Sequence, residues 1–194
     1  MGIILLTGPK HSGKTSTGRA LAALMKSPFI DLDELIAKRE GKSPRELYRK
    51  GPEAFRVAEA AALQSLLPPE KACIVLAAGG GLCDNPAAPE LLKSPGLSVV
   101  SLETSAETAW NRIEEAAGGL PPFLDTENPR ETHRLLHERR SAAYHSLAQI
   151  HIRGEGKSPE QIASEIAALL TVEIGIADPD ACGGEFSTGI YYTL

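Results

Sequence analysis

Cysteine, tryptophan and methionine are scarce in this chain of 194 residues, which holds three, one and two of them. The cysteines, Cys73, Cys83 and Cys182, are too few for a disulfide framework and lack the spacing of a metal site, so we expect a reduced, cytoplasmic setting. No apolar run approaches the ~18 residues that a membrane span requires. Basic residues are also outnumbered. The net charge of −5 argues against nucleic acid as the main partner, because phosphate-backbone binding needs a basic face.

Short apolar runs alternate with stretches of helical periodicity. Strands are predicted at residues 2–7, 28–31, 72–78, 97–102 and 149–153, and helices at about 52–67, 86–93, 105–115, 130–147 and 158–171. This alternation predicts an α/β fold whose five-stranded parallel sheet carries helices on both faces. Ligands bind such sheets beyond the carboxyl ends of the strands.

Three segments depart from this alternation. Residues 33–60 are helical and charged but broken by Gly41, Pro44 and Gly51-Pro52. Residues 114–129 contain too much glycine and proline for a regular element and are typical of a mobile lid. Residues 172–194 form a tail whose sequence indicates no role.

The most informative stretch reads Gly-Pro-Lys-His-Ser-Gly-Lys-Thr from Gly8 to Thr15 and matches the pattern G-x-x-x-x-G-K-[ST]. In this pattern backbone N–H groups surround nucleotide phosphates, the lysine reaches the β and γ oxygens, and the hydroxyl holds Mg²⁺. A predicted strand precedes it and a helix follows, so we favour a nucleoside-triphosphate site over a turn that binds nothing. The predicted nucleotide-binding residues are Gly8, Lys10, His11, Ser12, Gly13, Lys14, Thr15 and Ser16.

Two carboxylates, Asp31 and Asp33, come at the end of the second predicted strand. Alternation along a strand places their side chains on the same face. One can then face the metal while the other orients or deprotonates an acceptor hydroxyl, as phosphoryl transfer requires. The alternative is that either residue caps a helix that begins near Glu34.

The run Gly79-Gly80-Gly81 follows the third predicted strand and offers backbone that a ligand can approach closely, although a tight turn would need the same residues. Arg56 and Arg140 lie in predicted helices. Either is a solvated surface charge or a fork that binds a carboxylate or phosphate. Glu59, on the same helical face as Arg56, can hold its guanidinium.

Together these features resemble the shikimate kinase family. The matching segments are G-x-x-x-x-G-K-T-x-x-G from Gly8 to Gly18, Phe29–Asp33, Gly51–Arg56 with Glu59, Gly79–Gly81, and Arg140 with Tyr144 and Ala148. They occur in the family's order and at its approximate spacing. The resemblance implies one P-loop kinase domain over residues 1–171, with a substrate-binding segment at about 33–60 and a lid at about 114–129. It also implies a monomer that phosphorylates the 3-hydroxyl of shikimate with ATP and Mg²⁺.

The resemblance further implies roles for individual residues. Lys14 acts in catalysis and binds the triphosphate, while Thr15 ligates Mg²⁺ with Asp31 in its outer shell. Asp33 contacts the shikimate ring hydroxyls and serves as the base. The implied contacts to the shikimate carboxylate are Arg56 and Arg140, those to its ring are Gly79, Gly80 and Gly81, and those to adenine are Arg112, Lys157 and Pro159.

Two positions depart from the family pattern. His11 stands where the phosphate loop usually has glycine, at some cost if that residue adopts a positive φ. Leu120 stands where the lid usually has an arginine that contacts the transferring phosphates, and no Lys or Arg occurs between Ile113 and Pro129. Such a cation is worth ~10³-fold or more in related enzymes.

The lid therefore leaves three readings open: a slow enzyme, a substitute cation, or loss of activity. Arg130 and Arg139 are the candidate substitutes. Two alternative functions therefore stay open beside shikimate phosphorylation. One is a kinase of another small hydroxy acid, and the other is an impaired homologue that binds its ligands with little turnover.

Overall fold

The computed structural model describes residues 2–67, 73–116 and 120–174. Its five strands form one parallel sheet with the order β2-β3-β1-β4-β5, which confirms the predicted α/β fold. The strands are β1 (Ile3–Thr7), β2 (Phe29–Asp31), β3 (Ile74–Ala77), β4 (Leu97–Glu103) and β5 (Ile150–Arg153). The helices are α1 (Lys14–Leu24), α2 (Leu32–Glu40), α3 (Pro44–Lys50), α4 (Pro52–Gln64), α5 (Ala88–Leu91), α6 (Ala106–Glu115), α7 (Pro129–Leu147) and α8 (Pro159–Ile174).

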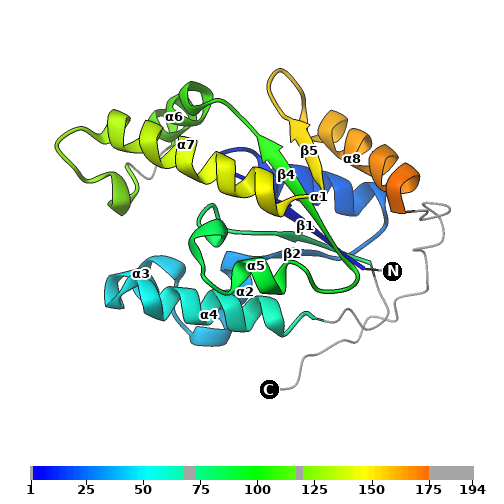
Figure 1. Cartoon of the computed structure of the whole chain (residues 1–194), viewed down its shortest axis with the longest axis horizontal. Helices are drawn as coiled ribbons and strands as arrows, with labels where there is room; N and C mark the ends of the chain where they lie inside the picture. The colour runs from blue at the N-terminus through cyan, green and yellow to red at the C-terminus, as the bar shows by residue number, and fades with distance from the viewer. Residues whose placement is uncertain (1, 68–72, 117–119, 175–194) are drawn as a thin grey trace.

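Helices cover both faces of the sheet (Figure 1). Ile3 and Leu5 belong to one buried cluster with Ala62 of α4, whereas Ile4 and Leu6 belong to a second cluster with residues of α1 and α8. Consecutive side chains of a strand point to opposite faces. Because both faces are covered, β1 is buried at every position, which explains its unbroken apolar sequence.

The charged segment 33–60 folds as three short helices, and the predicted breaks separate them. Gly41 ends α2 with a φ of 61°, in the left-handed region that glycine tolerates. Ser43 and Glu46 form a capping box before α3, and Pro44 and Pro52 occupy the first turns of α3 and α4. Helix α2 begins directly after β2 and packs on α4, which in turn packs on α3.

Between α6 and α7, the described residues of the lid include a short 3₁₀ turn, η2 (Pro122–Leu124). Leu124 is buried against Trp110 and Ile113 of α6, so this part of the lid is packed on the domain. Residues 117–119 of the predicted lid lie outside the described residues.

Several predicted element bounds differ from the structure. The helix predicted at 52–67 ends at Gln64, and the one predicted at 86–93 is only Ala88–Leu91, preceded by the 3₁₀ turn η1 (Leu82–Asp84). Helix α8 continues to Ile174, past its predicted end at 171 and into the predicted tail. The rest of that tail lies outside the described residues.

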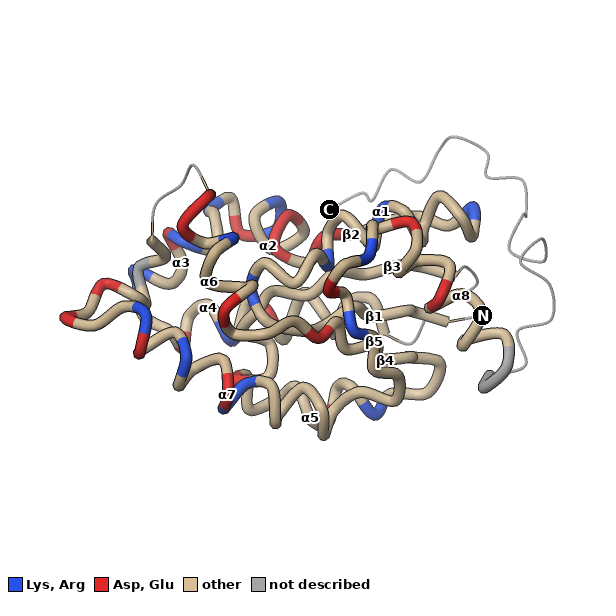
Figure 2. The backbone as a smooth tube through the Cα atoms, turned by 90° about the horizontal axis from the view of Figure 1, so that it is seen from above, with Lys and Arg blue, Asp and Glu red and all other residues tan. Residues whose placement is uncertain are grey.

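The described elements agree with the composition in the mixture of charges that they carry and in the length of their apolar segments. Acidic and basic residues are interspersed along the backbone in Figure 2, and α7 carries both signs. In the part of the chain that the structure describes, no helix is both long and apolar enough to cross a membrane.

Candidate active site

The phosphate loop connects β1 to α1 in a conformation that depends on positive φ angles. Gly8 and Gly13 have φ values of 136° and 93°, and His11 has 61°. His11 therefore adopts the conformation for which the family pattern places a glycine, and a histidine tolerates it at some cost. Gly13 directly precedes α1, so the helix N-terminus faces the loop and favours an anion there.

Lys14 lies almost completely buried under this loop. Its Nζ donates to the carbonyl oxygens of Gly8, at 3.0 Å, and Pro9, at 2.7 Å. Burial lowers the pKa of Lys14 to about 8, against the opposing effect of Asp33 and Asp31. Carbonyl dipoles compensate the positive charge of the ammonium only in part. The loop therefore suits a phosphate, which carries full negative charges.

Thr15 and Asp31 form the link between the loop and the second strand. Thr15 Oγ1 donates to Asp31 Oδ2 at 3.0 Å, while Asp31 Oδ1 accepts from the backbone N–H of Asp33 at 3.0 Å. Asp31 is thus the N-cap of α2, as the capping alternative proposed. The strand-alternation argument was wrong because β2 ends at Asp31 and α2 begins at Leu32. A hydroxyl beside a carboxylate is nevertheless a suitable donor set for Mg²⁺.

Asp33 stands in the first turn of α2 and faces the glycine run. A β-carbon at Gly79 would lie only 3.0 Å from Asp33 Oδ1. Burial and the charge of Asp31 raise the pKa of Asp33, with Lys14 and Lys10 acting in the opposite direction. A raised pKa makes the carboxylate a stronger base, which suits proton transfer from a hydroxyl.

The glycine run brings the separate parts of the site together. A β-carbon at Gly80 would lie 2.9 Å from the backbone nitrogen of Lys10, and one at Gly81 would lie 3.6 Å from Arg140 Nη2. The Tyr144 hydroxyl donates to the Gly80 carbonyl at 2.5 Å and so ties the run to α7. The absence of side chains at these positions therefore allows the loop, the carboxylate and an arginine to converge.

Arg140 is held by a carboxylate that the sequence did not single out. Its Nε and Nη2 donate to Asp84 Oδ2, and Arg139 Nη1 lies 2.8 Å from Asp84 Oδ1. Burial acts to raise the pKa of Asp84, but the hydrogen bonds from both arginines outweigh it and keep that pKa below its usual value. Arg140 also lies over the ring of Phe123 in the lid, with 5.7 Å between Cζ and the ring centroid.

The expected contact between Glu59 and the Arg56 guanidinium is wrong. Arg56 Nη1 lies 3.7 Å from Glu53 Oε2, one turn earlier in α4. Glu59 is 1% exposed and accepts from Asn85 Nδ2, which also donates to the Arg56 carbonyl. Burial raises the pKa of Glu59 to about 7. Glu59 is therefore connected to Arg56 through Asn85 and the backbone.

The residues predicted around adenine come from α6 and from the segment at the start of α8, and Glu155 connects the two by accepting from Ser105 N and Thr108 Oγ1. Arg112 Nη1 donates to the His11 carbonyl at 2.8 Å, which puts it directly against the phosphate loop. Lys157 pairs with Glu165 at 2.5 Å, and Pro159 begins α8. Their contact with a nucleotide stays a prediction.

Sequence reasoning missed two residues that shape the site, Asp84 and Asn85, and assigned no role to Tyr144. Tyr144 follows Arg140 by one helical turn, a spacing that could have assigned both to one face of α7. Asp84 and Asn85 follow the glycine run closely, but no local pattern pairs them with partners 26 to 56 residues away.

A parallel sheet of this order, with a phosphate loop after β1 and an acidic pair beyond β2, defines a P-loop phosphotransferase. The model of a family described as shikimate kinase matches residues 10–171. The chain belongs to the shikimate kinase family. The activity of this family is the phosphorylation of shikimate with ATP and Mg²⁺.

Similar proteins cover most of the chain. The shikimate kinase of Thermus thermophilus is 38% identical over 168 residues, which are 86% of this chain and 89% of the relative. That of Vibrio parahaemolyticus is 34% identical over 168 residues, 86% and 95% of the two chains. Among solved structures, shikimate kinase from Acinetobacter baumannii in complex with shikimate has a TM-score of 0.77 at 29% identity, covering 92% of this chain and 96% of that one.

A more distant likeness concerns the fold alone. A gluconokinase from Sinorhizobium meliloti has a TM-score of 0.56 at 19% identity, over 91% of this chain and 98% of that one. Kinases of other hydroxy acids thus share the architecture, and the identity of the substrate depends on the site.

Proposed function

We propose that this protein transfers a phosphoryl group from ATP to the 3-hydroxyl of shikimate, with Lys14 and Asp33 as its catalytic residues. The observation that carries the proposal is the glycine run. Asp33, Lys10 of the phosphate loop and Arg140 all lie near this stretch of backbone without side chains. An acidic, hydroxylated substrate requires this combination: a cation for its carboxylate and a carboxylate for its hydroxyl.

The nucleotide side of the site is supported by the fit of the loop to an anion. Bound Mg²⁺-ATP supplies the phosphoryl group and the divalent charge. Lys14 and the loop N–H groups neutralise the phosphates. Thr15 would provide a hydroxyl ligand for the metal, and Asp31 would contact the metal through water in its outer shell. The nucleotide contacts proposed for the rest of the loop are Gly8, Lys10, His11, Ser12, Gly13 and Ser16, and those for adenine are Arg112, Lys157 and Pro159.

The substrate side depends on three charged residues around the glycine run. Asp33 accepts a hydrogen bond from the 3-hydroxyl and takes its proton as that oxygen bonds to the γ-phosphorus of ATP, while the bond from this phosphorus to ADP breaks and ADP leaves. Arg140 binds the substrate carboxylate with the part of its fork that Asp84 does not occupy. Arg56 adds a second cation on α4, and its weak, exposed pairing with Glu53 leaves it free to turn toward a ligand.

We further propose that the protein acts as a monomer in the cytoplasm. All the proposed site residues come from one chain, and the few cysteines suit a reducing compartment. Size-exclusion chromatography with light scattering tests the oligomeric state, and a dimer mass would contradict it.

A coupled ADP-release assay tests the main proposal. Shikimate, quinate and gluconate are compared at equal concentration with Mg²⁺-ATP. We expect turnover that is selective for shikimate. Selectivity for either other acid would point to a different hydroxy acid as substrate, and absence of turnover with all three would contradict catalysis.

A further inference from the structure

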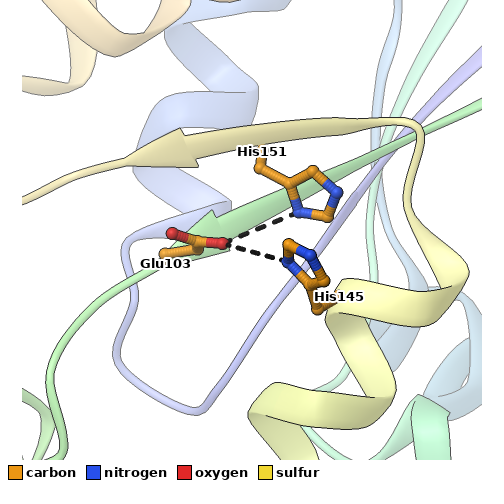
Figure 3. Close-up of side chains that lie close together, drawn as sticks. All are labelled: Glu103, His145 and His151. Carbon is orange, nitrogen blue, oxygen red and sulfur yellow. Dashed lines mark ion pairs between the residues drawn. The ribbon is translucent and has the colours of Figure 1, made fainter.

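Three side chains that bind metals well meet at the carboxyl ends of two neighbouring strands (Figure 3). Glu103 is the last residue of β4, His151 lies in β5, and His145 lies in the last turns of α7. Each offers one ligand atom, and these three atoms lie within 4.8 Å of one another. The proposed kinase reaction uses none of these residues.

The fold explains why this cluster forms. In the parallel register Ser101 pairs with His151 and Glu103 with Arg153. Side chains two residues apart share a face, so Glu103 and His151 lie diagonally on one face of the sheet. Helix α7 packs on β4 and brings His145 to the same place. The two imidazole rings lie 4.2 Å apart between centroids.

The distances suit a metal ion better than hydrogen bonds. Nδ1 of His145 and Nδ1 of His151 lie 3.7 and 3.6 Å from the same oxygen, Glu103 Oε1. Both distances exceed the usual limit of about 3.2 Å for an N–H···O bond. Ligand atoms around a tetrahedral Zn²⁺ are about 3.3–3.6 Å apart, given bonds of ~2.0–2.2 Å. In addition, His151 Nδ1 is buried and has no hydrogen-bond partner among the described residues.

Access to the cluster also fits an open metal site. Glu103 and His145 line a groove of about 500 Å³ that extends to Pro9 of the phosphate loop. The groove leaves room for a water molecule as a fourth ligand. Arg153 Nε lies 3.8 Å from Glu103 Oε2, so it contacts the carboxylate oxygen that does not face the histidines. This exposed arginine orients Glu103 but also opposes a cation nearby.

We propose that Glu103, His145 and His151 form a binding site for one divalent transition-metal ion of the Zn²⁺ type, separate from the Mg²⁺ of the nucleotide. Two imidazoles and one carboxylate are a donor set that Zn²⁺ takes readily and Mg²⁺ does not. The site is independent of the proposed kinase activity.

Calorimetric titration of the full chain with Zn²⁺, without nucleotide and in excess Mg²⁺, tests the proposal. We expect one ion per chain, and Co²⁺ in its place should give the visible absorption of a tetrahedral site. His145→Ala should weaken Zn²⁺ binding by at least about tenfold, because loss of a ligand costs more than loss of the groups that support one. The His145 side chain is 71% exposed, so this change spares the fold.

Four further variants complete the test. Glu103→Gln should weaken binding as His145→Ala does, whereas Arg153→Ala should strengthen it by removing the opposing charge. Glu107→Gln, an exposed carboxylate of α6, is the matched control and should leave affinity unchanged, as should Cys83→Ser. Failure of the unsubstituted protein to bind Zn²⁺, or unchanged affinity in His145→Ala, overturns the proposal.

Discussion

Both Nε and Nη2 of Arg140 donate to a single oxygen of Asp84, at 3.0 and 2.7 Å. The two side chains are only 15% and 17% exposed, so solvent screens this contact weakly. The contact occupies Nε and Nη2 on one side of the guanidinium and fixes the direction in which Nη1 points. We infer that Asp84 positions Arg140 for a ligand carboxylate.

Asp84→Asn should raise KM for shikimate about tenfold while KM for ATP stays the same. An amide forms a weaker hydrogen bond with a guanidinium than a carboxylate does, and a charge-assisted bond is worth roughly 1.5–3 kcal/mol. Steady-state kinetics with each substrate varied in turn measure the effect. Glu90→Gln, which breaks an exposed ion pair on nearby α5, is the control. A lower KM for shikimate in Asp84→Asn would instead mean that Asp84 competes with the substrate.

Arg140→Ala and Arg56→Ala should each raise KM for shikimate by roughly 10- to 100-fold, the cost of losing a hydrogen bond to a charged group. KM for ATP should change little, because neither side chain contacts the phosphate loop in a described hydrogen bond. Arg134→Ala is the matched control on α7, since the ion pairs of Arg134 with described residues are to Glu131 and Glu138 of its own helix. Equal increases in both KM values would contradict a role in carboxylate binding.

The sheet and the phosphate loop could be predicted because their signals are local. An unbroken apolar run indicates a parallel strand that is buried on both faces. The loop pattern has glycines at the positions where the backbone conformation requires them. The region after β2 shows where such rules stop. Strand alternation predicted Asp33 on the same face as Asp31, but Asp31 is the last residue of β2 and its side chain caps α2, so Asp33 is helical. The chain had two local options, and only the structure shows which one holds.

The partners of the buried charges could not be predicted for a different reason. Helical spacing offers Arg56 both Glu53 and Glu59, and nothing local distinguishes them. The structure buries Glu59 and pairs it with Asn85, a residue on another element. The same holds for Arg140 and Asp84. These contacts depend on how α4, α7 and η1 pack, which no short pattern encodes.

Asp33→Asn should lower kcat by roughly 10²- to 10⁴-fold, the usual contribution of a general base. Affinity for Mg²⁺-ATP, measured by calorimetry, should stay nearly the same because the loop remains intact. Glu34→Gln is the control. It changes the adjacent carboxylate, whose side chain is 72% exposed and pairs with Arg19. An unchanged kcat in Asp33→Asn would exclude Asp33 as the base.

Glu59 should make the stability of the protein depend on pH. Its pKa is about 7 in the folded protein and 4.5 in the unfolded chain. The folded state therefore binds more protons between these values, so the free energy of unfolding falls as pH rises from 4.5 to 7. Glu59→Gln removes this effect. Relative to the unsubstituted protein, it should gain up to ~3 kcal/mol at pH 8 and almost nothing at pH 4.5, since each pKa unit is worth ~1.4 kcal/mol.

Chemical denaturation of both proteins across this pH range measures the difference. The control is Gln64→Glu, which adds an exposed carboxylate to the end of α4. Ala62→Ser in the same helix is unsuitable because Ala62 lies in the core. A difference between Glu59→Gln and the unsubstituted protein that does not vary with pH would contradict the buried titration.

Leu120→Arg should raise kcat by about tenfold or more. Leu120 is 42% exposed in the lid, where the family pattern has a cation. Of the two candidate substitutes, Arg139 pairs with Asp84 at 2.8 Å, whereas Arg130 makes a weak, exposed contact of 3.8 Å with Glu107. A cation that reaches the transferring phosphates is worth ~10³-fold or more in related enzymes, so even imperfect placement gives a measurable gain. Leu120→Gln, of similar length and without charge, should give none. If kcat does not rise in Leu120→Arg, another cation already contacts the transferring phosphates. In that case Arg139→Ala should lower kcat, because Arg139 and Arg140 pair with the same carboxylate of Asp84.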